Sequence, residues 1–79
     1  MTLETAIKKY NLIKQEKCFD GVKLPNGYEL YTGEKHTEKA DYFYSADRDL
    51  NASKHFYLTI QAFYKGTNKE TTRVYILND

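Results

Sequence analysis

The chain has 79 residues, 41% of them hydrophobic and 15% aromatic, and its 12 basic and 11 acidic side chains give a net charge of +1. This length fits one small domain, residues 1–79, and the hydrophobic content excludes a disordered tail. The balanced charge excludes both a strongly basic nucleic-acid binder and an acidic mimic of nucleic acid.

The single cysteine, Cys18, excludes an internal disulfide. This cysteine usage is typical of a reducing compartment, so we predict a cytoplasmic protein. The first residues lack the basic and then apolar pattern of a secretion signal, and no apolar run approaches the ~20 residues that span a bilayer. We therefore predict no membrane association.

Residues 2–15 form the first predicted element, a helix. Thr2 is a suitable N-cap, and an apolar stripe recurs at helical spacing through Leu3, Ala6, Ile7, Tyr10 and Ile13. Leu12 points away from this stripe. Either the helix loosens near Asn11, or another segment of the chain covers Leu12.

Residues 22–30 predict a β-hairpin with the three-residue loop Pro25-Asn26-Gly27. Pro25 presets φ for the turn, and Gly27 suits the left-handed position of a bulge. This loop sets three cross-strand pairs: Leu24 with Tyr28, Lys23 with Glu29, and Val22 with Leu30. The hairpin is interpreted as architecture and not as a site.

The middle of the chain is ambiguous. Residues 32–40 are polar and indicate a connector, and residues 47–54 are rich in turn formers and indicate a loop. Between them, the three adjacent aromatics of residues 41–47 favour a strand. A helix also suits the spacing of Ala40, Phe43, Tyr44 and Leu50, so the segment 34–54 is left open between strand, helix and loop.

Residues 55–65 show the clearest strand pattern, and residues 71–79 add a second strand. Pairing Lys65 with Thr71 places Ala62 opposite Val74 and Ile60 opposite Ile76. The fold class is therefore α+β, with an N-terminal helix packed on one face of a four- to five-stranded antiparallel sheet in two layers. The other face would carry Tyr57, Thr59, Gln61, Phe63, Arg73, Tyr75 and Leu77.

No motif indicates a metal site. Cys18, His36 and His55 lie too far apart in the sequence for paired ligands. Residues 47–51 begin like a calcium loop, but Ala52 and Leu58 stand where an EF-hand needs glycine and glutamate. We predict no metal ligands.

Catalytic motifs are also missing from the sequence. Ser45, Ser53 and Cys18 lack any nucleophile signature, and the four glycines are isolated turn residues that form no phosphate-binding loop. We predict a protein that is not an enzyme, with no catalytic residues and no cofactor.

The predicted partner-binding residues are Tyr57, Gln61, Phe63, Arg73 and Tyr75, because tyrosine and arginine are enriched at interface hot spots. The same face could instead form a homodimer interface or be covered by residues 34–54. An exposed edge strand could also extend another sheet.

We expect a small protein-binding inhibitor or regulator that occupies a surface of a host protein, as phage and mobile-element proteins of this size often do. Single-stranded nucleic acid is the weaker alternative: Tyr57, Phe63 and Tyr75 would stack bases while Lys65 and Arg73 contact phosphates. The composition does not identify the partner.

Overall fold

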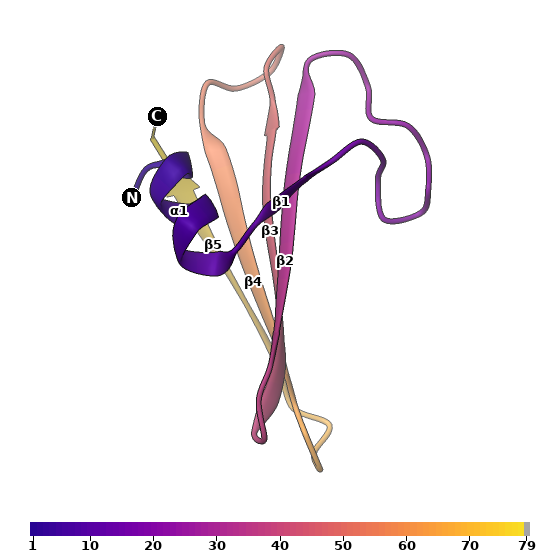
Figure 1. The fold of residues 1–79 in the computed structure, drawn as a ribbon, viewed down its shortest axis with the longest axis vertical. Helices are drawn as coiled ribbons and strands as arrows, with labels where there is room; N and C mark the ends of the chain where they lie inside the picture. The colour runs from indigo at the N-terminus through magenta and orange to yellow at the C-terminus, as the bar shows by residue number, and fades with distance from the viewer. Residues whose placement is uncertain (79) are drawn as a thin grey trace.

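The computed structural model describes residues 1–78, which contain one helix followed by five strands. The elements are α1 (Leu3–Tyr10), β1 (Ile13–Gln15), β2 (Tyr28–His36), β3 (Ala40–Asp49), β4 (Phe56–Tyr64) and β5 (Glu70–Leu77). The strands form one antiparallel sheet in the order β1-β2-β3-β4-β5, so neighbours in sequence are neighbours in space (Figure 1). An antiparallel sheet preceded by one short helix is thus confirmed. Asp79, which ends the predicted domain, lies outside the described residues.

The helix is shorter than the predicted range of 2–15. It begins as expected, with the Thr2 hydroxyl accepting a hydrogen bond of 3.2 Å from the backbone N–H of Thr5. It ends at Tyr10 because Asn11 adopts a left-handed conformation, with φ 51° and ψ 47°. This cap turns the chain so that Leu12 is buried in the core, which resolves the misfit noted in the sequence.

The predicted hairpin over residues 22–30 is wrong in its pairing. The turn itself forms, because Gly27 has φ 82° and the N–H of Tyr28 donates to the carbonyl of Pro25 at 3.1 Å. Tyr28, however, pairs with Asp49 of β3 and not with Leu24. The nine residues of β2 pair with nine residues of β3. This ladder has more cross-strand pairs than the three-pair hairpin predicted from the local pattern, so it is the more stable pairing.

The segment that precedes this turn folds back on itself. The N–H of Cys18 donates to the carbonyl of Val22 at 2.7 Å, and the N–H of Leu24 donates to the carbonyl of Glu16 at 3.4 Å. Residues 16–24 therefore form a separate loop beside β1 and β2. Figure 1 shows this loop projecting from the sheet on the side away from α1.

The ambiguous segment 34–54 is mostly strand. Residues 34–36 are the last residues of β2. Of the polar residues predicted to form a connector, only 37–39 form a turn between strands. The Thr37 N–H closes this turn by donating to the Ala40 carbonyl at 3.0 Å. β3 then runs to Asp49, so the aromatic run is a strand, as the three adjacent rings favoured. The predicted loop is confirmed for residues 50–54 only.

The strand pair β4–β5 forms, but its predicted register is wrong. Ala62 lies opposite Thr71 instead of Val74, a shift of three residues along β5. Because the shift is odd, it exchanges the two faces of β5. Leu77, which is 1% exposed and lies opposite Phe56, becomes the core residue, while Val74 and Ile76 turn to the other face.

One face of the sheet, here called the core face, carries most of the buried residues, whereas Leu30 is buried on the opposite face. Its buried cluster comprises Tyr44, Ala46, Phe56, Leu58 and Leu77 from the strands together with Ala6 and Leu12. The Tyr10 ring at the end of α1 stacks on Tyr44 with centroids 4.6 Å apart. Within residues 1–78, no helix is long and apolar enough to cross a membrane.

Candidate binding surface

The five residues predicted to bind a partner do not share a face. Tyr57, Gln61 and Phe63 lie on the side of the sheet opposite the core face, here called the open face. Arg73 and Tyr75 lie on the core face, because Arg73 pairs with Ile60 and Tyr75 pairs with Leu58. All five side chains are exposed, but the predicted surface is divided by the register shift of β5.

The strand register sets the open face. Its side chains form cross-strand rows over β2, β3, β4 and β5: His36–Asp41–Phe63–Glu70, Glu34–Phe43–Gln61–Thr72, Thr32–Ser45–Thr59–Val74 and Leu30–Asp47–Tyr57–Ile76. Phe43 and Phe63 meet edge to face with centroids 5.7 Å apart, and the His36 ring meets Phe43 at 6.2 Å. Val74 is 59% exposed and Ile76 is 61% exposed. The open face therefore presents apolar side chains from three adjacent strands.

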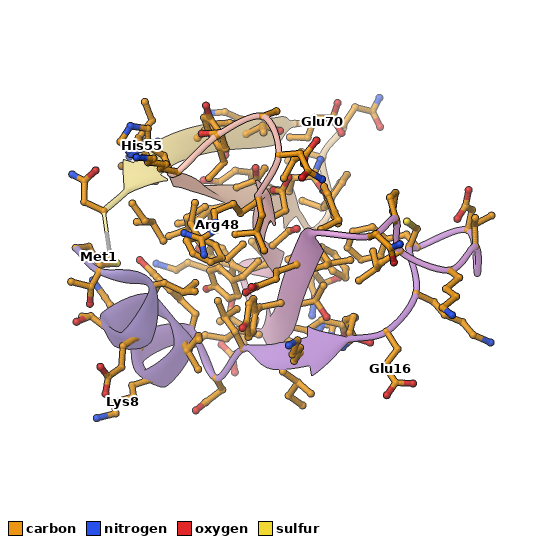
Figure 2. The ribbon with its side chains drawn as sticks, turned by 90° about the horizontal axis from the view of Figure 1, so that it is seen from above. Met1, Lys8, Glu16, Arg48, His55 and Glu70 are labelled. Atoms are coloured by element: carbon orange, nitrogen blue, oxygen red, sulfur yellow. The ribbon has the colours of Figure 1, made fainter. Side chains whose placement is uncertain are left out.

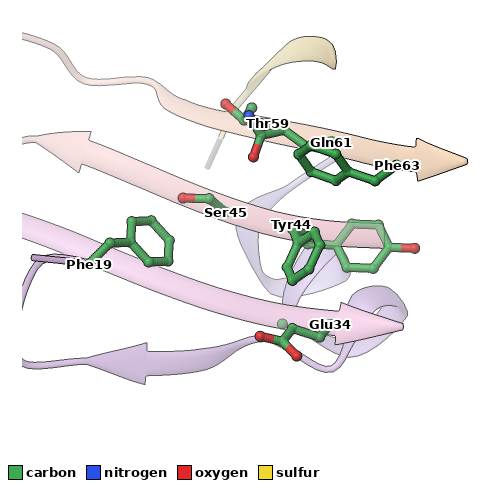
Figure 3. A pocket seen from close by; sticks show the side chains of 9 residues that line it. Phe19, Glu34, Tyr44, Ser45, Thr59, Gln61 and Phe63 are labelled. Atoms are coloured by element: carbon green, nitrogen blue, oxygen red, sulfur yellow. The ribbon is translucent and has the colours of Figure 1, made fainter. Parts of the chain in front are cut away.

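A shallow groove of about 600 Å³ runs across this face, lined by Phe19, Gly33, Glu34, Phe43, Tyr44, Ser45, Thr59, Gln61 and Phe63. Figure 3 shows Phe19 toward one end of the groove, with Phe63 and Glu34 toward the other. Ser45, Thr59 and Gln61 add hydroxyl and amide groups to the lining. The arrangement provides apolar contact with a few hydrogen-bonding groups, as protein and ligand sites require.

Phe19 reaches the groove because the loop 16–24 turns tightly around it. The N–H of Gly21 donates to the carbonyl of Cys18 at 2.9 Å, Gly21 has φ 84°, and the Asp20 carboxylate accepts from the N–H of Val22 at 3.1 Å. This turn leaves Phe19 81% exposed. A phenylalanine side chain this exposed contributes little to the core. Phe19 is therefore a candidate contact residue.

Sequence reasoning missed Phe19, Phe43, Val74 and Ile76 as surface residues. A signal existed for Phe19: the run Cys18-Phe19-Asp20-Gly21 places an aromatic residue directly before an Asp-Gly turn, where it cannot enter a regular strand. No signal existed for Val74 and Ile76, because either register of β5 gives an alternating pattern.

Charge divides the two faces. In the strands, the open face carries the acidic residues Glu34, Asp41, Asp47, Asp49 and Glu70. The core face carries the cationic residues Lys14, Lys35, Arg48 and Arg73 together with Glu29. The open face is thus aromatic and acidic although the whole chain is nearly neutral.

A cluster of charged groups closes one end of the open face. His36 Nδ1 lies 3.0 Å from Asp41 Oδ1, and His36 Nε2 lies 3.2 Å from Glu34 Oε2. Lys65 Nζ lies 3.5 Å from the same Asp41 oxygen. The hydrogen bonds to Asp41 and then Glu34 raise the pKa of His36 above its ordinary value, and the bond from His36 chiefly lowers the pKa of Asp41.

At the other end of this face, the Tyr28 hydroxyl donates to the Asp47 carboxylate at 2.9 Å. Partial burial, followed by this hydrogen bond and the negative charge of Asp47, raises the pKa of Tyr28 to about 12. The phenol therefore stays protonated at neutral pH and fixes the Asp47 carboxylate in place.

On the core face, Arg48 has a packing role. Its guanidinium carbon lies 3.9 Å from the centre of the Phe56 ring, and Nη1 donates to the carbonyl of Lys54 at 3.3 Å. Figure 2 shows Arg48 in the middle of the molecule, whereas Lys8 and Glu16 point outward. Burial chiefly raises the pKa of Tyr44 on the same face.

Across residues 1–78, no three His, Cys, Asp or Glu side chains are grouped so that they could hold a metal ion. Cys18 is a free thiol and is partly buried.

No family model matches the chain, no curated protein has a significant match to its sequence, and no solved structure has a significant match to its fold. The proposals below therefore rest on the surface itself.

Proposed function

We propose that this protein is a non-enzymatic binding protein that inhibits or regulates another protein by occupying part of its surface. The open face is the contact surface, and the single observation that carries the proposal is its aromatic groove. Phe43 and Phe63 pack against each other in this groove, which Phe19 also lines, and Phe63 and Phe19 are 41% and 81% exposed. Exposed aromatic clusters of this kind are typical of interfaces.

The charge of the open face defines the chemistry of the partner. Five carboxylates lie on the same face as the groove, and Glu34 lines it, so a complementary protein surface would carry lysine or arginine around an apolar centre. The same charges argue against nucleic acid, because carboxylates repel phosphates. Lys65 is engaged with Asp41, and Arg73 lies on the core face.

Two further points belong to the proposal. The first is that α1 serves as the second layer of an α+β domain, supported by Ala6 being fully buried in the core cluster. The second is a cytoplasmic location, supported by the lone Cys18. A phage or mobile-element origin stays a hypothesis from size and composition.

A pair of matched variants tests the surface. Phe63→Ala and Tyr75→Ala each remove an exposed aromatic from β4 or β5, 41% and 44% exposed respectively, but from opposite faces of the sheet. We expect a host protein to be captured from the native lysate by the wild type and Tyr75→Ala, and to be lost with Phe63→Ala. The measurement is quantitative mass spectrometry of the captured proteins.

Two results would refute the proposal. One is equal capture of the same proteins by wild type and Phe63→Ala, with both variants folded by circular dichroism. The other is tight binding of a labelled single-stranded oligonucleotide at low salt that falls steeply as salt is added, because this salt dependence is the signature of phosphate contacts.

A further inference from the structure

The two edges of the sheet differ in length. β1 is an edge of three residues, whereas β5 is an edge of eight residues, and its outer side is unpaired within residues 1–78. In Figure 1, β5 runs beside β4 and passes behind α1. A long unpaired edge is the part of a sheet best suited to pair with another strand.

The backbone of β5 has a defined direction of hydrogen bonding. The hairpin closes with the N–H of Tyr64 donating to the carbonyl of Lys69 at 3.1 Å. Because hydrogen-bonded pairs alternate along an antiparallel ladder, the next ones are Ala62–Thr71, Ile60–Arg73 and Leu58–Tyr75. The intervening residues of β5, which are Glu70, Thr72, Val74 and Ile76, therefore direct their N–H and carbonyl groups away from β4.

The protections usual for edge strands are absent from the part of β5 that follows Arg73. The run from Arg73 to Leu77 contains no proline and no charge after Arg73, and β5 continues without a bulge through its eight pairs with β4. Val74 and Ile76 combine outward backbone groups with mostly exposed apolar side chains.

We propose that β5 pairs antiparallel with β5 of a second copy of this chain, about a two-fold axis between the two Val74 residues. A two-fold axis normal to the sheet keeps each face continuous, so paired residues must come from the same face. The register centred on Val74 places Thr72 opposite Ile76 of the second copy. It also places Arg73 opposite the exposed Tyr75 ring of the second copy, a favourable cation–π pair.

The neighbouring registers are poorer. Centring on Arg73 would set two guanidinium groups directly opposite each other, which destabilises a sheet. Centring on Tyr75 would place Arg73 opposite Leu77, which is already buried and offers no exposed ring. The register centred on Val74 therefore pairs the outward N–H and carbonyl groups and also places compatible side chains opposite each other.

The expected assembly is a reversible dimer. One strand pair buries less than the ~1,200 Å² of a standard stable interface, so the dimer should form with increasing protein concentration. It would join two sheets into a ten-stranded sheet with one uninterrupted open face. Dimer formation goes beyond the proposed function, and its test requires no partner protein.

Cysteine cross-linking tests the register in a Cys18→Ser background. Val74→Cys should form a disulfide-linked dimer under mild oxidation, because opposite residues in such a pair have Cα atoms about 5.5 Å apart. Thr72→Cys alone and Ile76→Cys alone should stay monomeric on a non-reducing gel, whereas a mixture of the two should cross-link. Cross-linking of Thr72→Cys alone, or none in the mixture, would overturn the proposal.

Sedimentation velocity on the wild-type chain tests association without any cross-link. We expect a monomer–dimer equilibrium that Val74→Pro shifts to monomer, because proline removes an outward N–H that β4 does not use. Lys8→Ala, on α1 and 79% exposed, should leave the equilibrium unchanged. A wild-type chain that stays monomeric at every concentration, or a dimer that a folded Val74→Pro variant retains, would overturn the proposal.

Discussion

The two faces of this sheet differ in how deeply their apolar side chains are buried, although the side chains come from the same strands. Along β4, Leu58 is fully buried within the core cluster, while Phe63, five residues on, is 41% exposed beside Phe43. The difference shows that hydrophobic content alone does not locate the core in a small sheet. Here the free energy of folding comes mainly from one face, which leaves the aromatic groups of the other face available for contacts.

The largest expected effect is on the core face. Leu58→Ala should lower the free energy of unfolding by about 3 kcal/mol, because it removes a fully buried side chain and leaves a cavity. Urea denaturation followed by circular dichroism measures the change. A loss below about 1 kcal/mol would mean that the core is not the main source of stability.

A smaller loss is expected where α1 ends against the sheet. A Cβ added at Gly33 would lie 2.7 Å from the backbone oxygen of Tyr10 and 3.1 Å from Leu12 Cδ2. Gly33→Ala should therefore force the helix end outward and cost about 1–3 kcal/mol. Thr72→Ala, exposed on β5, is the control and should change the denaturation midpoint little; equal midpoints for both variants would contradict the close approach.

On the open face, the effect on stability should be smaller still. Phe63→Ala loses its edge-to-face contact with Phe43, worth about 0.5–1 kcal/mol. The same urea titration, run beside Leu58→Ala, compares the two faces directly. A loss as large as that of Leu58→Ala would show that the open face is part of the core, and the proposed contact surface would then fail.

The smallest effect concerns the charged cluster at His36. The raised pKa of His36 means that its contribution to stability is fully present below pH 6.5 and is lost as the pH rises through its higher folded-state pKa. The lowered pKa of Asp41 gives a contribution that is present above pH 3.8 and is lost as the pH falls through its lower folded-state pKa.

An NMR titration of His36 checks this cluster. Asp41→Asn should return the pKa of His36 toward 6.5, because the hydrogen bond to Asp41 is the largest cause of the shift. Glu34→Gln should return it less far. An unchanged His36 titration in Asp41→Asn would show that the pair is not formed in solution.

The sequence predicted those features that depend on local chemistry. The N-cap at Thr2, the left-handed Gly27 and the strand at residues 56–64 follow from side-chain type and period. The end of α1 could not be placed, because a left-handed Asn11 competes with an apolar stripe that continues to Ile13. Tertiary burial of Leu12 decides that competition, and no local pattern encodes it.

The candidate site was predicted only in part, and the reason lies in β5. Val74 and Ile76 alternate with Tyr75 and Leu77, so both of its faces are apolar and either could turn inward. Burial of Leu77 against Phe56 selects the register, and with it the faces of Arg73 and Tyr75. Tyr57, Gln61 and Phe63 share one face in either register, since they lie on the same strand.

The unbroken strand order also has a kinetic consequence. From β2 to β5, each strand pairs with the next through short connections at residues 37–39, 50–55 and 65–69. Closing such short loops costs little chain entropy, so refolding should be faster than in β-sandwiches of equal size, whose strands pair across distant parts of the chain. The connection at 16–27 is the longest, so β1 and the helix before it should join last.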